Sequence, residues 1–255
     1  MKRFLKPVYL PLMVLFLGVV TCLLRFWLFD LGTDDRGLLN AGSAPDVLSW
    51  VMVALAMALI ALGSRSPEMD ALTLRAPRSA LGLVLAAVCF VVSGISQLTS
   101  AADILQTACG VFAFVAAAAL LLLAWCRYIG SRSHILMHTA LCLFLILCLV
   151  SRYRVWSSYS QLQCYAFELL TVAFTMLAGY HRAAFDVDLG KRKAYNFFSL
   201  GALFFALSAI AGSQDPVFFL GCALWMIATP AGLLPADTEA PAKEEEAAEA
   251  EQAEE

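Results

Sequence analysis

The sequence predicts an all-α protein, a polytopic membrane bundle of about eight transmembrane helices with both termini in the cytoplasm. Of its 255 residues, 61% are hydrophobic and only 15% are charged. A soluble domain of this size carries about 25% charged residues, so the solvent of this chain is predicted to be lipid. Long apolar runs are separated by short polar loops, and about 20 mainly apolar residues let a helix cross a hydrocarbon layer.

Eight runs fit this description, and helices are favoured over strands in each of them. Strands of a transmembrane barrel alternate apolar and polar residues, whereas these runs are apolar on nearly every face. A helix also satisfies its own backbone hydrogen bonds in lipid. The predicted helices span Val8–Phe29, Val47–Leu62, Ser79–Ser96, Ala102–Ile129, Ile135–Val150, Tyr159–Tyr180, Ala194–Ala211 and Pro216–Leu234.

The start of the first run is similar to a secretory signal peptide, because Lys2, Arg3 and Lys6 precede it. Its apolar stretch continues to Leu28, which is longer than a cleaved signal segment usually is. We therefore expect this run to be an uncleaved first transmembrane helix.

The orientation follows from the distribution of basic residues, which favour cytoplasmic loops. With the N-terminus inside, the outer side keeps only Arg25, Arg36, Arg152 and Arg154. The inner side then holds thirteen basic residues, namely Lys2, Arg3, Lys6, Arg65, Arg75, Arg78, Arg127, Arg132, Arg182, Lys191, Arg192, Lys193 and Lys243. This asymmetry alternates correctly only with eight crossings, so the helix count and the orientation support each other.

Residues 1–234 are predicted to form the transmembrane bundle, and residues 235–255 a disordered acidic cytoplasmic tail. From Asp237 onward the chain holds nine acidic residues against Lys243 alone, and such a segment cannot bury a core. The loops between the runs are too short for a nucleotide-binding or kinase module. We expect no cofactor and no nucleic-acid partner.

Neither the histidines nor the cysteines predict a metal site. His134 and His138 stand four residues apart but lack the His-Glu-x-x-His pattern of zinc enzymes. The acidic loop Asp30–Gly37 lacks the alternating ligands and closing Glu of an EF-hand. All eight cysteines fall in or beside apolar runs without a Cys-x-x-Cys pair, which favours a role as small apolar filler.

Polar residues follow one face of the predicted sixth helix. Four of them recur at intervals of seven, which keeps them on one side of a helix: Gln161, Glu168, Thr175 and Arg182. Tyr165 and Thr171 lie beside this stripe. Glu168 stands eight or nine residues into the predicted helix, which at about 1.5 Å per residue places it near the membrane midplane.

An isolated charge at that depth costs about 3 kcal/mol, so Glu168 requires a partner, a proton or water. Arg25 is one predicted partner, and Arg152 and Arg154 are others if the chain folds inward after the fifth helix. The pattern fits a structural ion pair or a neutral hydrogen-bonded Glu as well as a ligand or proton site. As a ligand or ion pathway, the candidate residues are Glu168, Arg25, Gln161, Tyr165, Thr171, Thr175, Arg152 and Arg154.

Three short stretches carry a resemblance to a known group of sequences. Arg154-Val-Trp-Ser-Ser, Gln161-Leu-Gln and Tyr180-His-Arg-Ala-Ala-Phe-Asp resemble those of hypothetical multi-pass membrane proteins from Clostridia-type (Firmicutes) gut bacteria. The resemblance covers most of the chain except the acidic tail. It implies a bacterial plasma membrane and no particular chemistry.

The function that the sequence favours is binding or transport of a small polar solute along the polar face of the sixth helix. The alternative is a non-catalytic membrane subunit or sensor of a larger complex, with a membrane protein as its partner. An enzyme is disfavoured, since no Ser and His pair, paired-Asp site or zinc motif has a workable spacing. The partners expected are the lipid bilayer and either a solute or a membrane protein.

Overall fold

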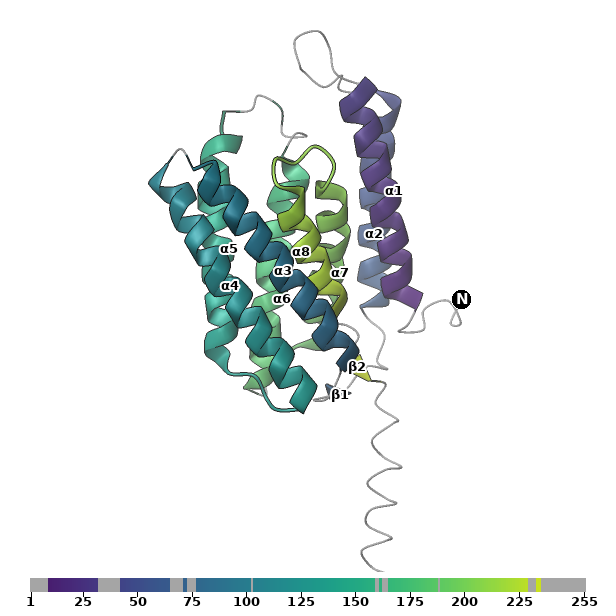
Figure 1. The fold of residues 1–255 in the computed structure, drawn as a ribbon. Coiled ribbons are helices and arrows are strands. Elements are labelled where there is room, and N and C mark those ends of the chain that lie inside the picture. The colour runs from purple at the N-terminus through teal and green to yellow at the C-terminus, as the bar shows by residue number, and fades with distance from the viewer. Residues whose placement is uncertain are drawn as a thin grey trace, which may run out of the picture.

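The computed structural model describes residues 9–31, 42–64, 71–72, 77–101, 103–158, 161, 165–187, 189–228 and 233–234. Within these residues the chain forms eight helices and one pair of two-residue antiparallel strands (Figure 1), which confirms the all-α class. The elements are α1 (Tyr9–Leu31), α2 (Ala44–Gly63), β1 (Ala71–Leu72), α3 (Pro77–Thr99), α4 (Ile104–Ile129), α5 (Ile135–Trp156), α6 (Ala166–Asp186), α7 (Arg192–Ala209), α8 (Pro216–Ala228) and β2 (Leu233–Leu234).

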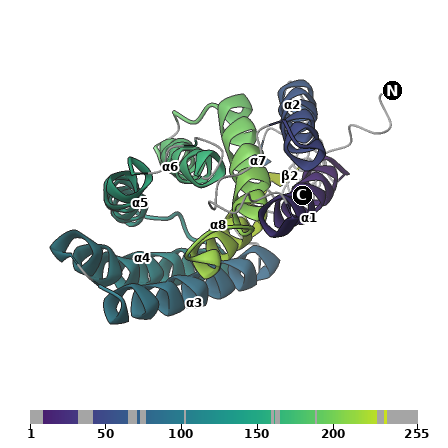
Figure 2. The ribbon, with the colours of Figure 1, turned by 90° about the horizontal axis from the view of Figure 1, so that it is seen from above.

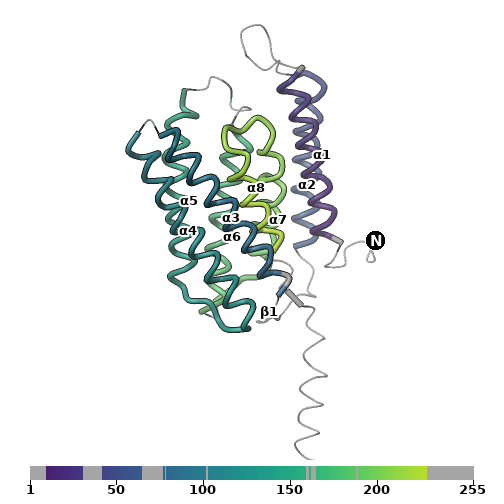
Figure 3. Tube along the Cα trace, in the orientation of Figure 1, coloured from purple at the N-terminus to yellow at the C-terminus, as the bar shows by residue number. Residues whose placement is uncertain are grey.

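Successive helices run in opposite directions, as Figures 1 and 3 show. Helices α1, α3, α5 and α7 therefore end where α2, α4, α6 and α8 begin. We call this the upper end of the bundle, as it is drawn in Figure 1, and the other the lower end. The predicted tail, residues 235–255, and the loop around residues 32–41 lie outside the described residues.

The helices are arranged around α8 and α7. Seen from above, α3 and α4 lie side by side, and α8 packs between α3 and α7 (Figure 2). Helix α5 joins α4 to α6, while α1 and α2 form a hairpin that packs on α7. This order brings the upper ends of α3, α5, α6 and α8 around one region.

Small residues allow the closest helix approach, between α3 and α4. A Cβ atom on Gly94 would lie 3.1 Å from the carbonyl oxygen of Gly110. A Cβ atom on Gly110 would in turn lie 3.2 Å from the carbonyl oxygen of Gly94. Because lipid supplies no hydrophobic drive between helices, such close backbone packing is a main source of their association.

Aromatic rings fill the centre of the bundle. The ring of Phe90 on α3 lies 5.5 Å from that of Phe144 on α5 and 5.6 Å from that of Phe218 on α8, centroid to centroid. Trp225 on α8 meets the edge of Phe90 at 6.5 Å. All four side chains are buried, so this cluster holds α3, α5 and α8 together below the upper end.

The outer surface of the bundle is apolar. Phe16, Leu81 and Trp125 are 65%, 65% and 62% exposed. Soluble proteins rarely expose large apolar side chains over a whole surface. Within the described residues, five stretches are long and apolar enough to cross a membrane, namely Leu10–Asp30, Ala44–Gly63, Ser79–Thr99, Ile104–Ile129 and Ile135–Trp156. These helices fit an integral membrane protein.

The predicted boundaries of three helices need correction. Helix α5 continues to Trp156, six residues beyond the predicted end. Helix α6 begins at Ala166, seven residues after the predicted start at Tyr159. Helix α8 is described from Pro216 to Ala228, and Leu233–Leu234 forms β2, so the predicted continuation of the helix to Leu234 is wrong.

A polar pocket as the candidate functional site

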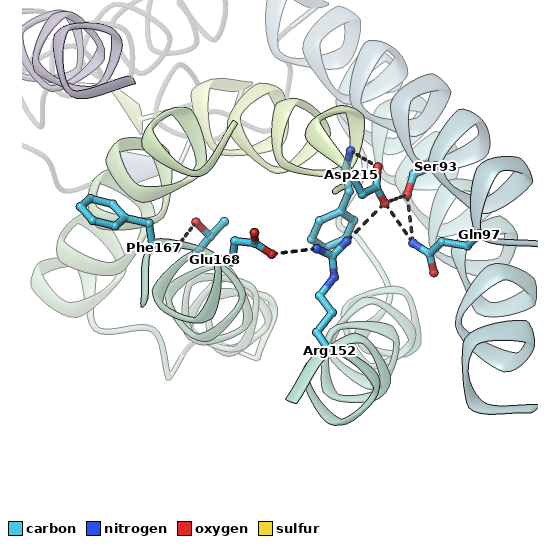
Figure 4. Close-up of polar contacts among 8 residues, drawn as sticks. Ser93, Gln97, Arg152, Phe167, Glu168 and Asp215 are labelled. Atoms are coloured by element: carbon cyan, nitrogen blue, oxygen red, sulfur yellow. Dashed lines mark hydrogen bonds and ion pairs between the residues drawn. The ribbon is translucent and has the colours of Figure 1, made fainter. Parts of the chain in front are cut away.

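Arg152 stands at the centre of a charged cluster at the upper end. It lies near the end of α5 and reaches one carboxylate on α6 and one just before α8 (Figure 4). One terminal nitrogen lies 3.3 Å from Oε2 of Glu168 on α6, and the other lies 3.2 Å from Oδ2 of Asp215, just before α8. The guanidinium carbon lies 4.6 Å and 4.9 Å from the ring centroids of Phe218 and Phe219. The nitrogens and the face of this guanidinium are therefore engaged together.

Asp215 connects this cluster to α3 and caps α8. Its Oδ1 accepts a hydrogen bond from the backbone N–H of Phe218 at 3.1 Å, as expected of an Asp that precedes a helix opening with proline. Its Oδ2 accepts from Ser93 Oγ at 2.5 Å and from Gln97 Nε2 at 3.1 Å (Figure 4). Both carboxylate oxygens are thus fully used by the protein.

Glu168 is the third residue of α6, where the helix dipole favours a negative charge. A second cation, Arg25 of α1, acts on Glu168 through its charge. Arg25 is only 2% exposed, and its guanidinium carbon lies 4.0 Å from the ring centroid of Phe167. Arg25, Arg152, Glu168 and Asp215 therefore balance two positive charges against two negative charges across four segments of the bundle.

A cavity of about 410 Å³ adjoins this cluster. Its wall comes from the upper ends of α1, α3, α4, α5 and α6 and from the connection between α7 and α8, and most of its lining residues carry polar side chains. The residues that line it are Phe29, Ser96, Gln97, Ser100, Asp103, Leu105, Gln106, Ser151, Arg152, Arg154, Val155, Trp156, Glu168, Gly212, Gln214 and Asp215. A neighbouring cavity of about 400 Å³ shares Asp103, Leu105 and Arg154 with it. We call the first cavity the upper pocket.

A second ion pair borders the upper pocket. Arg154 of α5 lies 3.2 Å from Oδ2 of Asp103, the residue before α4. Their side chains are 62% and 63% exposed, whereas those of Arg152, Glu168 and Asp215 are 16%, 10% and 14% exposed. The pocket therefore has a buried charged floor and an exposed charged rim.

The structure brings together part of the residue set predicted from the sequence. Glu168, Arg152 and Arg154 line the pocket, and Arg25 lies close enough to act on Glu168. The predicted position of Glu168 eight or nine residues into its helix is wrong, because α6 begins at Ala166 and Glu168 sits in its first turn. Of the two partners that the sequence offers for Glu168 after the fifth helix, Arg152 pairs with it and Arg154 pairs with Asp103. Both lie on α5 itself, so no inward fold of the chain is needed to bring Arg152 to Glu168.

The other predicted residues fall outside the pocket. Gln161 precedes α6 and is not part of its polar face. Tyr165 stacks its ring on Trp156 at 5.7 Å. Thr171 is buried and donates to the carbonyl of Phe167 in its own helix, and Thr175 is also buried within α6. Of the predicted polar stripe, only Glu168 therefore lines the pocket.

Sequence reasoning missed Asp215 as a site residue, along with Ser93 and Gln97. The Asp-Pro pair at residues 215 and 216 signals a helix start and could have identified the cap. The contact of Asp215 with Ser93 spans 122 residues of sequence, and no local pattern indicates it. Ser93 and Gln97 are four residues apart on α3 and face the same side.

A separate polar cluster lies at the lower end. Asp186 accepts a hydrogen bond from Ser133 Oγ at 2.6 Å and lies 3.0 Å from His138 Nε2 and 3.6 Å from Arg182. Ser133 lies 3.3 Å from the same Nε2 atom, so serine and acid share one imidazole nitrogen, unlike a catalytic triad. Among the described residues, no group of three or more His, Cys, Asp or Glu side chains could hold a metal.

The upper pocket therefore combines hydrogen-bond donors, acceptors and both signs of charge at one end of an apolar bundle. In its floor, one guanidinium and one carboxylate connect α3, α5 and α6 with the start of α8. No protein-family model, curated protein or solved structure matches this chain.

Proposed function

We propose that this chain is a multi-pass protein of a bacterial plasma membrane that binds a small polar solute in its upper pocket, as a step in transport or sensing. The observation that carries the proposal is the cavity of about 410 Å³ lined by Glu168, Arg152 and Arg154. Small-molecule sites commonly have volumes of about 300 to 1,000 Å³. Polar and charged side chains within a membrane bundle are costly, and they usually mark a solute or ion pathway.

The distribution of basic residues supports an outward-facing pocket. Arg127, Arg132, Arg182 and the run Lys191–Lys193 all belong to the lower end of the bundle. The basic residues at the described upper end are Arg25, Arg152 and Arg154, all engaged with carboxylates or aromatic rings. Since basic residues favour the cytoplasmic side, the lower end is cytoplasmic in this proposal, and the pocket opens outside.

Native mass spectrometry of the gently solubilised protein tests the proposal, with Glu168→Gln compared against the wild type. We expect the wild type to retain a small polar solute and Glu168→Gln to bind it about tenfold or more weakly, because the substitution leaves Arg152 of the pocket lining with one carboxylate partner fewer and changes the charge beside the solute. Asp46→Asn is the matched control, because Asp46 is a buried carboxylate in the first turn of α2, outside the pocket lining.

Two results would count against solute binding. A partner polypeptide in place of a solute would favour the subunit or sensor function instead. Equal solute retention in the wild type and Glu168→Gln would remove Glu168 from the site.

A further inference from the structure

We propose that the solute is a zwitterion of the α-amino acid type, with its carboxylate bound by Arg154 and its ammonium group by Asp103. This inference rests on the proposed function and names the class of solute that the upper pocket takes. It follows from a difference between the two charged parts of the pocket, the buried floor and the exposed rim.

The floor is poorly suited to exchange its partners for a ligand. Arg152 uses both terminal nitrogens on Glu168 and Asp215 and its face on two phenylalanine rings. Asp215 uses one oxygen on Arg152, Ser93 and Gln97 and the other on a backbone N–H. Removing one member would leave the others buried without compensation, which is strongly unfavourable. The floor therefore supports the pocket and sets its charge balance.

The rim pair is suited to exchange. Arg154 and Asp103 meet through one contact of 3.2 Å, and both side chains are more than 60% exposed. Exposed ion pairs of this kind contribute little to stability, so a ligand can separate them at small cost. Both residues line the upper pocket, and a guanidinium can bind a ligand carboxylate through two parallel hydrogen bonds.

Charge balance selects the class of solute. The floor, with Arg25, is neutral, and so is the rim pair. An anion that took Arg154 would place its negative charge beside the carboxylate of Asp103, and a cation that took Asp103 would place its positive charge beside the guanidinium of Arg154, so either ion would be attracted by one rim residue and repelled by the other. A zwitterion replaces both partners at once. In an α-amino acid the ammonium and carboxylate groups are attached to the same carbon. The carboxylate can therefore reach the guanidinium of Arg154 while the ammonium group reaches the carboxylate of Asp103 beside it.

The test uses the full-length protein in lipid nanodiscs and three matched sets of probes. These are a mixture of the twenty common L-amino acids, the same set as α-carboxamides, which lack the carboxylate charge, and the same set as N-acetyl derivatives, which lack the ammonium charge. Native mass spectrometry and the shift of the thermal unfolding midpoint report binding. We expect binding from the amino acids at concentrations at least tenfold lower than from either modified set.

Variants of the rim complete the experiment. We expect Arg154→Gln and Asp103→Asn each to weaken amino acid binding at least tenfold, while Arg132→Gln, an exposed site at the lower end, binds as the wild type does. Wild-type binding by both rim variants, or equal binding of the three probe sets, would overturn the zwitterion assignment. Retention of an uncharged polyol that Glu168→Gln loses would also overturn it, yet would leave the proposed function standing. Absence of any retained solute would contradict the proposed function itself.

Discussion

Replacing Arg152 with methionine is expected to destabilise the folded protein by about 3 to 5 kcal/mol, the cost of removing one partner from a buried charge cluster. Methionine keeps an unbranched stem but has no charge, so it would leave Glu168 and Asp215 without the cation between them on the floor of the pocket. Both carboxylates are at least 86% buried as side chains, and water can compensate them only in part. SDS titration of the protein in mixed micelles measures the free energy of unfolding.

Two comparisons separate this effect from a general sensitivity to lost positive charge. Arg154→Gln removes an exposed guanidinium from the same helix and is expected to cost less than about 1 kcal/mol. Adding Glu168→Gln and Asp215→Asn to Arg152→Met is expected to recover part of the lost stability, since the two unpaired charges disappear together. Equal losses from Arg152→Met and Arg154→Gln would contradict the assignment of Arg152 as the centre of the cluster.

Phe90→Ala is expected to have the next largest effect, a destabilisation of about 3 kcal/mol. Phe90 is fully buried and contacts Phe144, Phe218 and Trp225, so its truncation leaves a cavity where α3, α5 and α8 meet. Buried Phe→Ala substitutions cost about 3 to 5 kcal/mol in soluble proteins. The lower end of that range applies because a ring that becomes exposed on unfolding in a membrane meets lipid, which solvates it better than water does.

Phe16→Ala is the matched control for this prediction, because Phe16 is 65% exposed on α1 and meets lipid rather than protein. It is expected to change the free energy of unfolding by less than about 0.5 kcal/mol. The same SDS titration measures both variants. If the two substitutions cost the same, the aromatic cluster would not be the packing centre of the bundle.

The number and type of the helices could be predicted because their signal is local. Each apolar run predicts a helix without reference to the rest of the chain, and all eight helices are present among the described residues. The ends were less predictable, since polar residues continue a helix where neighbouring segments supply partners for them. Arg152 and Arg154 looked like loop residues, yet they extend α5 by six residues because their charges meet carboxylates on neighbouring segments.

The candidate site could be predicted only where one residue was conspicuous by itself. Glu168 is an acid in an apolar run, which marks it as a candidate by itself, and Arg152 is one of the partners that the sequence predicts for it. Asp215 could not be identified in this way, because an acid before a proline is typical of an ordinary turn. Its partners on α3 are also distant in sequence. The contact between Asp215 and α3 forms because α8 packs between α3 and α7. A local sequence pattern does not predict the order in which helices pack.

Cysteine labelling on intact cells tests most directly the proposal that the upper pocket opens to the outside of a membrane-spanning bundle. Ser100 is an exposed residue that lines the pocket, and Ser131 is an exposed residue at the lower end. With labelling of the wild type subtracted, a membrane-impermeant maleimide should modify Ser100→Cys on intact cells and Ser131→Cys only after the cells are permeabilised. Labelling of Ser131→Cys alone on intact cells would contradict the orientation, and equal labelling of both would contradict a membrane-spanning bundle.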